Sequence, residues 1–246
     1  TGSLLFAFCG FTIVGSGWYI FSFESFNMAL LLLSYEQLVS KKQWYLFPVA
    51  IFLICISQPF NLYVYGIFMI TYVLLRQAQS GTLSLKSTGV VFLQMIGLGV
   101  LGMLLSAPLM IENIFQLLES PRGSGANSYA SVLLAQPMFA TADKVQFGTS
   151  VMRLFSSDMV GSGNEVFKGW QNFLEAPLFY CGLPCLLLTP QVFQFLDKKV
   201  KIAFGIFLAV WLLPVIFPYF RYAFWLFTGD YYRAYSVLVA FTLLYY

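Results

Sequence analysis

The chain consists largely of apolar runs long enough to enter or cross a lipid bilayer, separated by short polar connections. A helix needs about 20 apolar residues to span a hydrocarbon core about 30 Å thick. Of the 246 residues, 59% are hydrophobic and 9% are charged, whereas a soluble domain has roughly 25% charged residues. A water-soluble fold cannot hide so much apolar surface. The sequence therefore predicts an integral membrane protein.

We predict an all-α fold, a polytopic transmembrane helical bundle of about 7–8 membrane segments in a single membrane domain. N-terminal membrane helices would occupy 1–118, a long loop 119–176, and C-terminal membrane helices 177–246. An eighth segment begins near Tyr231. The other seven are expected at 4–21, 26–39, 44–57, 60–75, 88–118, 177–196 and 202–220.

The basic residues orient these segments, because lysine and arginine concentrate in short cytoplasmic loops. Placing every basic connection inside makes the crossings alternate and leaves the short connection 22–25 and the long loop 119–176 extracytoplasmic. Polar and apolar patches alternate in that loop, which favours short helices lying on the membrane surface. The basic connections hold Lys41 and Lys42, then Arg76 and Lys86, then Lys198, Lys199 and Lys201.

The stretch 44–75 contains a candidate helix break at Gln58, Pro59 and Asn61. Proline removes a backbone donor, and the two polar side chains offer partners for carbonyls that lose theirs. One long tilted helix remains the alternative, but we favour two short ones. At the other end of the long loop, the run Glu175-Ala176-Pro177 predicts a helix that begins at Pro177, because proline is favoured at the first position of a helix.

Several ionisable residues are candidates for chemistry. Glu112 lies inside an apolar segment, where a charge needs water, a partner or a ligand. Arginines that fall on the outer side suit phosphate, which the guanidinium binds in a bidentate manner; these are Arg122, Arg153, Arg221 and Arg233. Simple contact with lipid headgroups is the other interpretation. Glu24 and Asp230 are outer acids that suit a base, a metal ligand or a solvated turn.

Some functions have no support. The net charge of +3 is small and the basic residues are scattered, so no nucleic-acid partner is expected. The chain has no histidine, so Cys181 and Cys185 lack further ligands for a metal site. All four cysteines fall in apolar runs, where a reduced thiol behaves as a small hydrophobe.

Taken in order, several short motifs resemble the bacterial YfhO membrane-protein family over nearly the whole chain. They are Gly17-Trp18-Tyr19, Phe26-Asn27, Tyr35-Glu36-Gln37-Leu38, residues 58–65, Leu105-Ser106-Ala107-Pro108, residues 116–122, residues 176–182 and Tyr231-Tyr232-Arg233-Ala234-Tyr235-Ser236.

This resemblance implies a GT-C type glycosyltransferase in the bacterial cytoplasmic membrane. Its partners would be membrane lipid, a polyprenyl-phosphate-linked sugar donor and a cell-envelope polymer acceptor such as lipoteichoic acid. The resemblance implies no particular cofactor, and a divalent cation is compatible with it. The catalytic acid of such enzymes is expected upstream of residue 1, so the catalytic residue stays unassigned and these 246 residues are expected to be inactive alone.

On this interpretation, arginines would contact the donor phosphate and acids the sugar hydroxyls. The substrate-binding candidates are Arg122, Arg221 and Arg233 for the phosphate, and Glu24, Glu112 and Asp158 for the sugar. Two other functions compete with it. A transporter or flippase also uses broken helices and intramembrane polar groups, typically in repeated halves. A non-catalytic membrane scaffold would need neither donor nor solute.

Overall fold

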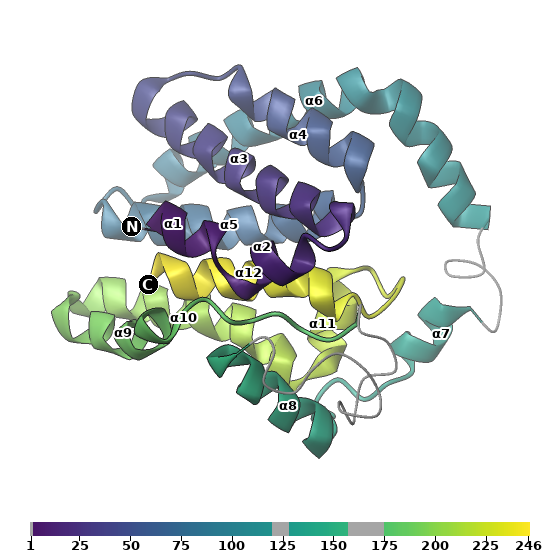
Figure 1. Cartoon of the computed structure of the whole chain (residues 1–246). Coiled ribbons are helices and arrows are strands. Elements are labelled where there is room, and N and C mark those ends of the chain that lie inside the picture. The colour runs from purple at the N-terminus through teal and green to yellow at the C-terminus, as the bar shows by residue number, and fades with distance from the viewer. Residues whose placement is uncertain (1, 120–127, 157–174) are drawn as a thin grey trace. The chain divides into compact units, whose positions relative to one another are not determined.

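The structure, a computed structural model, describes residues 2–119, 128–156 and 175–246, and within these ranges every regular element is a helix (Figure 1). The helices are α1 (Gly2–Ala7), α2 (Gly10–Gly15), α3 (Tyr19–Lys41), α4 (Leu46–Ser57), α5 (Asn61–Gln79), α6 (Leu85–Glu119), α7 (Tyr129–Leu134), α8 (Lys144–Phe155), α9 (Leu183–Phe195), α10 (Lys198–Ile216), α11 (Pro218–Phe224) and α12 (Tyr232–Tyr245).

Two of the described helices are long and apolar enough to cross a membrane. They are α6, over Leu85–Gln116, and α10, over Lys198–Ile216. Most of each apolar window is not buried inside the protein. The all-helical class is therefore confirmed, and the two spans accord with a membrane protein. The bundle of seven or eight crossings, and which loops face outside, stay predictions.

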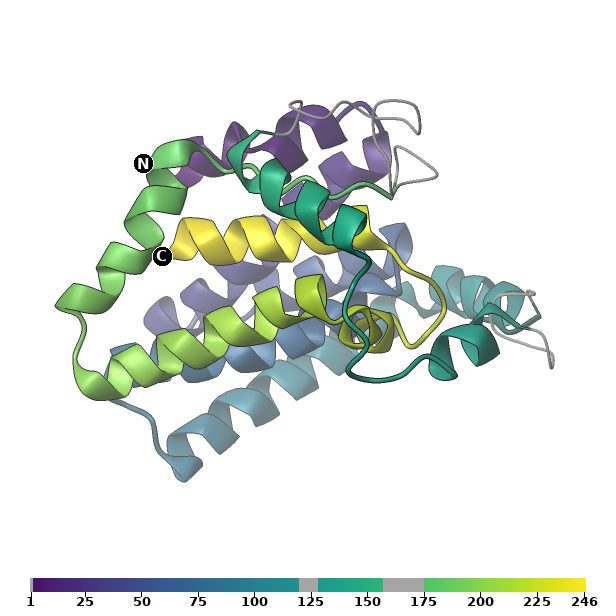
Figure 2. The same cartoon turned by 90° about the horizontal axis from the view of Figure 1, so that it is seen from below.

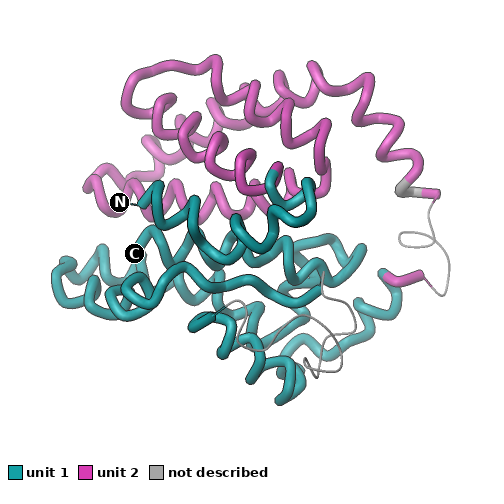
Figure 3. Tube along the Cα trace, in the orientation of Figure 1, with its two compact units in different colours: residues 1–22, 130–246 teal, residues 23–129 magenta. Residues whose placement is uncertain are grey.

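The chain divides into two compact units, which are described separately (Figure 3). Unit 1 comprises Thr1–Ser22 and Ala130–Tyr246, and unit 2 comprises Phe23–Tyr129. The division of the sequence into membrane helices at 1–118 and 177–246 with a loop between them stays a prediction.

The predicted first segment, 4–21, is not one helix. The chain breaks after α1, breaks again at Ser16–Trp18, and then runs as α3 straight through the predicted connection 22–25. Glycine weakens helices, and this stretch contains several. The amide of Gly10 also bonds the carbonyl of Tyr180 at 2.6 Å, which fixes the start of α2 against a distant segment. Hydropathy alone does not register either effect.

In unit 2, the predicted break at Pro59 is confirmed. Helix α4 ends at Ser57 and α5 begins at Asn61, so 44–75 forms two helices. Helix α6 packs against α4 at Gly102. A Cβ atom there would lie 2.6 Å from the carbonyl oxygen of Pro48 and 2.8 Å from Cβ of Ile51. The two helices approach this closely because the residue has no side chain.

In unit 1, α12 is the central element, in contact with α1, α2, α9 and α10 (yellow in Figure 2). Ten of its residues are buried, including Tyr235 and Ser236. Figure 2 also shows the extended strand-like trace that leads into α9. This extended segment, 176–182, contradicts the helix start predicted at Pro177. The helix begins at Leu183, after Gly182 with its positive φ of 97°, and Pro184 occupies its first turn.

Two short helices, α7 and α8, lie within the described part of the predicted outer loop. Asp143 caps α8, because its carboxylate accepts from the amide of Val145 at 3.0 Å and that of Gln146 at 3.4 Å. A carboxylate in this position satisfies free helix donors and complements the helix dipole. The predicted short helices are therefore present, and their position on the membrane surface stays a prediction.

Candidate functional site

Three arginines of unit 1 are buried. Arg153 on α8 is 1% exposed, Arg221 on α11 is 2% exposed and Arg233 on α12 is 4% exposed. Burying a charge costs free energy unless it is paired and hydrogen-bonded. Each guanidinium must therefore be held by specific groups.

Arg221 is held on three sides. Its Nε and Nη2 both donate to the carboxylate of Asp230, the second at 2.7 Å. Its Nη1 donates to the carbonyl of Pro214 at 2.8 Å. In a continuous helix that carbonyl would accept from residue 218, but Pro218 has no N–H. The arginine replaces the missing donor at the break between α10 and α11. Its guanidinium carbon also lies 3.7 Å from the ring centre of Tyr232, within cation–π range.

Arg153 and Arg233 both reach the extended segment 176–182. Arg153 Nη1 donates to the carbonyl of Pro177 at 2.7 Å, and Arg233 Nε donates to that of Ala176 at 3.4 Å. The amide of Leu178 donates to Oγ of Ser236 at 2.9 Å. An extended segment lacks internal hydrogen bonds, so its buried polar groups need partners from elsewhere. Side chains of α8 and α12 supply them.

Tyr232 joins the three helices that carry these arginines. Its hydroxyl donates to Oγ of Ser150 on α8 at 3.0 Å, and its ring lies against Arg221. We call the three buried arginines, together with Asp230 and Glu175, the arginine site; it consists of Arg153, Glu175, Arg221, Asp230 and Arg233. Glu175 lies exposed at its edge, next to Ala176. Partial burial, and then repulsion from Asp230, raise the pKa of Glu175 above its ordinary value. A carboxyl group tuned toward neutrality can exchange a proton.

Unit 2 has a separate buried polar cluster around Glu24. The Glu24 side chain is 3% exposed, and its Oε1 accepts from Nδ2 of Asn61 at 3.1 Å. Asn61 also reaches the hydroxyl of Tyr65, while Asn27 donates to Oγ of Ser57 at 2.9 Å. The sequence predicted that Asn61 would bond a carbonyl freed by the helix break. In the structure, Asn61 donates to Glu24 instead. Among described residues, Oε2 of Glu24 has no hydrogen-bond partner.

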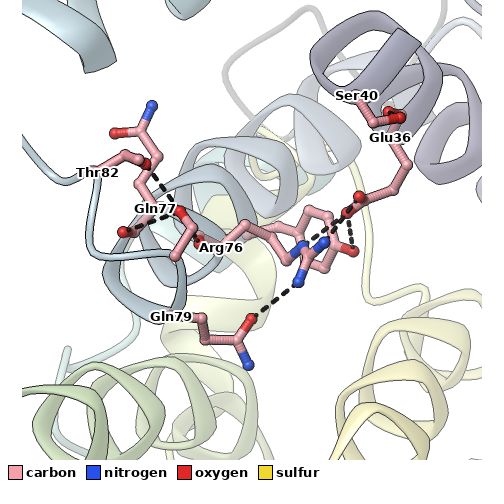
Figure 4. A network of polar contacts seen from close by, with 8 residues as sticks. Glu36, Ser40, Arg76, Gln77, Gln79 and Thr82 are labelled. Atoms are coloured by element: carbon pink, nitrogen blue, oxygen red, sulfur yellow. Dashed lines mark hydrogen bonds and ion pairs between the residues drawn. The ribbon is translucent and has the colours of Figure 1, made fainter.

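A second polar network of unit 2 joins α3 to α5 (Figure 4). Arg76 Nε and Nη2 donate to the two carboxylate oxygens of Glu36 at 2.7 and 2.8 Å. The Tyr72 hydroxyl adds a bond to Glu36 at 2.9 Å, and Arg76 Nη1 donates to Gln79 at 3.2 Å. Both ionised side chains are about one-third exposed, at 39% and 34%. This network ties α3 and α5 together near their C-terminal ends and bonds both carboxylate oxygens of Glu36.

The model of a family described as "Bacterial membrane protein YfhO" matches residues 1–246 of the chain. The chain belongs to the YfhO family of bacterial membrane proteins. No curated protein and no solved structure matches it significantly. The resemblance seen in the sequence motifs is thereby confirmed, and the arginine site is a feature of a YfhO-family chain.

The structure brings together some of the site residues predicted for this YfhO-family chain. Arg221 and Arg233 both belong to the arginine site. Glu24 is buried in the other unit, and Glu112 lies exposed on α6 without a hydrogen bond or ion pair to another described residue. Arg122 and Asp158 lie outside the described residues.

Sequence reasoning did not select three members of the arginine site as substrate-binding residues. Arg153 was noted as one of several outer arginines suited to phosphate, Asp230 as an outer acid suited to a base, a metal ligand or a solvated turn, and Glu175 as part of a helix start. Arg221 and Asp230 lie nine residues apart on either side of the turn at 225–227, and this closeness in the chain is a local signal that could have paired them. No group of three or more His, Cys, Asp or Glu side chains suited to a metal occurs among the described residues of the YfhO-family chain.

Proposed function

We propose that the full-length protein is a membrane glycosyltransferase of GT-C type. It would transfer a sugar from a polyprenyl-phosphate donor to a cell-envelope polymer, such as lipoteichoic acid, on the outer face of the cytoplasmic membrane. The observation that carries this proposal is that two buried arginines, Arg153 and Arg233, reach one extended segment, while a third, Arg221, lies against Tyr232, which is bonded to α8. Membership of a bacterial membrane-protein family accords with it.

Guanidinium chemistry supports a phosphate-bearing substrate. The planar fork of arginine matches two phosphate oxygens, and it keeps its charge when buried. In the transfer, the acceptor oxygen forms a bond to the anomeric carbon while the bond from that carbon to the donor phosphate oxygen breaks. Negative charge then grows on the departing lipid phosphate, and fixed positive groups stabilise it there.

The same reaction needs a group that takes the proton of the acceptor hydroxyl. Glu175 suits this role for three reasons: it is exposed, it immediately precedes Ala176 in the chain, and its pKa is raised. Glu112, exposed on α6, is kept as a candidate for sugar contact. A divalent cation beside the donor phosphate would add positive charge where the leaving group develops negative charge.

Arg233 is chosen for the test because removing Arg221 would also leave the carboxylate of Asp230 and the carbonyl of Pro214 without their partner. Full-length protein in vesicles would receive radiolabelled polyprenyl-phosphate sugar and lipoteichoic acid, and label in the polymer would be counted. We expect Arg233→Gln to lower kcat/KM about 100-fold or more, the usual effect of losing one donor to a developing charge. Arg76→Gln, which removes a paired arginine from the other network, is the matched control and should retain activity.

Full activity of a folded Arg233→Gln variant would refute the phosphate role and leave the arginines as braces for the extended segment. Failure of the wild-type protein to label any acceptor would refute the transferase itself.

A transporter or flippase is the second candidate, and one observation favours it. The helix break at Pro59 places Asn61 against Glu24, which is buried in the protein, and broken helices with polar side chains beside the break are a usual feature of transport sites. In the same vesicles, movement of the lipid-linked sugar across the bilayer without labelling of the acceptor would favour this function. Glu24→Gln should then abolish movement.

A further inference from the structure

Helix α8 has its polar side facing the protein and its apolar side facing outward. Its buried residues are Thr149, Ser150 and Arg153, which share one face at helical spacing. The rest of the helix circumference carries five apolar side chains that are 36–48% exposed, Val145, Phe147, Val151, Met152 and Phe155, with exposed Lys144 at its N-terminal end. A surface helix of a water-soluble protein shows the reverse arrangement. We call these five residues the apolar face of α8.

The start of α8 is attached to one end of a candidate membrane span. The amide of Ala142, just before the helix, donates to the carbonyl of Ile216, the last residue of α10, at 2.9 Å. Helices α8 and α10 are also in contact. At about 1.5 Å per residue, the 19 residues of α10 extend about 28 Å, which is close to the thickness of the hydrocarbon core. An element fixed to the end of such a span lies at the level of the lipid headgroups.

Aromatic side chains mark the same level. The ring of Phe139 lies 6.1 Å from that of Phe217 and 6.2 Å from that of Phe220, just beyond the end of α10. Phe139 itself is 71% exposed. The other end of α10 begins with Lys198 and Lys199, so the α8 end is the one without the lysine cluster. Lysines concentrate at the cytoplasmic end of membrane spans, and an exposed apolar ring such as that of Phe139 at the other end suits contact with lipid rather than water.

We propose that α8 lies in the headgroup layer of the membrane, with its apolar face directed toward the acyl chains of the lipid. A helix in this position buries its apolar face about 5–10 Å into the boundary between headgroups and chains. Lys144, exposed in the first turn, can extend toward lipid phosphates. The buried face of α8 carries Arg153 and Ser150, which bond Pro177 and Tyr232. The arginine site therefore adjoins the lipid surface whatever reaction it performs.

The test uses full-length protein in lipid nanodiscs, with the four native cysteines replaced by alanine. A nitroxide label is attached at Phe147→Cys or Val151→Cys on the apolar face, and at Lys199→Cys, exposed in the lysine cluster at the other end of α10, as the control. Power-saturation electron paramagnetic resonance then compares collisions with oxygen, which concentrates in lipid, and with a nickel chelate, which stays in water. We expect the two apolar-face labels to favour oxygen and the Lys199→Cys label to favour the nickel chelate.

Two results would overturn the proposal. Preferential contact of the apolar-face labels with the nickel chelate would show that this face lies in water. Protection of both labels from both reagents would show that protein covers it instead. The measurement needs no activity, so it stands or falls separately from the proposed transferase.

Discussion

Replacing Ser236 by alanine tests whether the extended segment 176–182 depends on side chains for its hydrogen bonds. The Oγ atom of Ser236 accepts from the buried amide of Leu178 at 2.9 Å and donates to the carbonyl of Tyr232 at 3.1 Å. Ser236 is 0% exposed, so water cannot take its place without a change in packing. The alanine variant leaves the amide of Leu178 without its acceptor.

The size of the effect follows from that unsatisfied donor. A buried polar group that loses its partner costs about 1–3 kcal/mol. The bond to Tyr232 adds little, because a helix carbonyl already accepts from the main chain four residues on. For a protein of 150–250 residues, 1 kcal/mol shifts Tm by about 2–4 °C. We therefore expect Tm to fall by at least about 2 °C in the Ser236→Ala variant.

The matched control lies six residues further along the same helix. Thr242 is also 0% exposed, but its hydroxyl has no hydrogen-bond partner among the described residues. Replacing an unpaired buried hydroxyl with a methyl group is neutral or stabilising, so Thr242→Val should keep or raise Tm. Tryptophan fluorescence of the purified protein in detergent follows both transitions. An equal fall of Tm in the two variants would refute the hydrogen-bond argument and point to general packing loss.

Three further changes have defined outcomes in the same melting experiment. Gly102→Ala should cost about 1–3 kcal/mol, because its Cβ would meet the carbonyl oxygen of Pro48 at 2.6 Å; an unchanged Tm would contradict the close packing of α4 and α6. Glu36→Gln should cost at most about 1 kcal/mol, because its pair with Arg76 is partly exposed, and a cost that does not shrink at high salt would argue against an ionic origin. Glu175→Gln should become more stable relative to the wild type as the pH rises. Because the pKa of Glu175 is raised in the folded protein, the stability that its protonated form contributes is lost as the pH rises through that pKa. A difference in Tm between variant and wild type that stays constant from about pH 4 to about pH 7 would contradict the raised pKa.

The fold was predictable from the sequence where the cause is local. Pro59 lacks an amide hydrogen and has polar neighbours at Gln58 and Asn61, and α4 and α5 are separated there. Proline alone does not decide this, because Pro108 lies inside the continuous helix α6. The breaks around α2 were not predicted, because a hydropathy window measures how apolar a stretch is and not whether its helix is continuous. The bond from Gly10 to Tyr180, which fixes one of these breaks, joins residues far apart in the chain. No pattern within a single segment contains that information.

The candidate site follows the same division. The positions of the apolar segments placed Arg153, Arg221 and Arg233 on the same predicted side of the membrane. They did not indicate that Arg153 reaches Pro177 from α8, because that contact depends on how the helices pack. Pro177 itself misled the interpretation. A proline after an acid usually opens a helix, but here it belongs to an extended segment whose polar groups are bonded by other elements.

Prolines and arginines of unit 1 are linked by a common physical requirement. Each departure from regular helix in a largely apolar protein leaves carbonyl groups without main-chain donors, and water is scarce there. Arg221 donates to the carbonyl of Pro214 at the α10–α11 break, and Arg153 donates to that of Pro177 in the extended segment. Arginine suits this role because it offers several donors on a long side chain and keeps its charge. The same residues that allow irregular backbone thereby gather positive charge at one place, so a brace for the main chain and a site for an anionic substrate can arise from one arrangement.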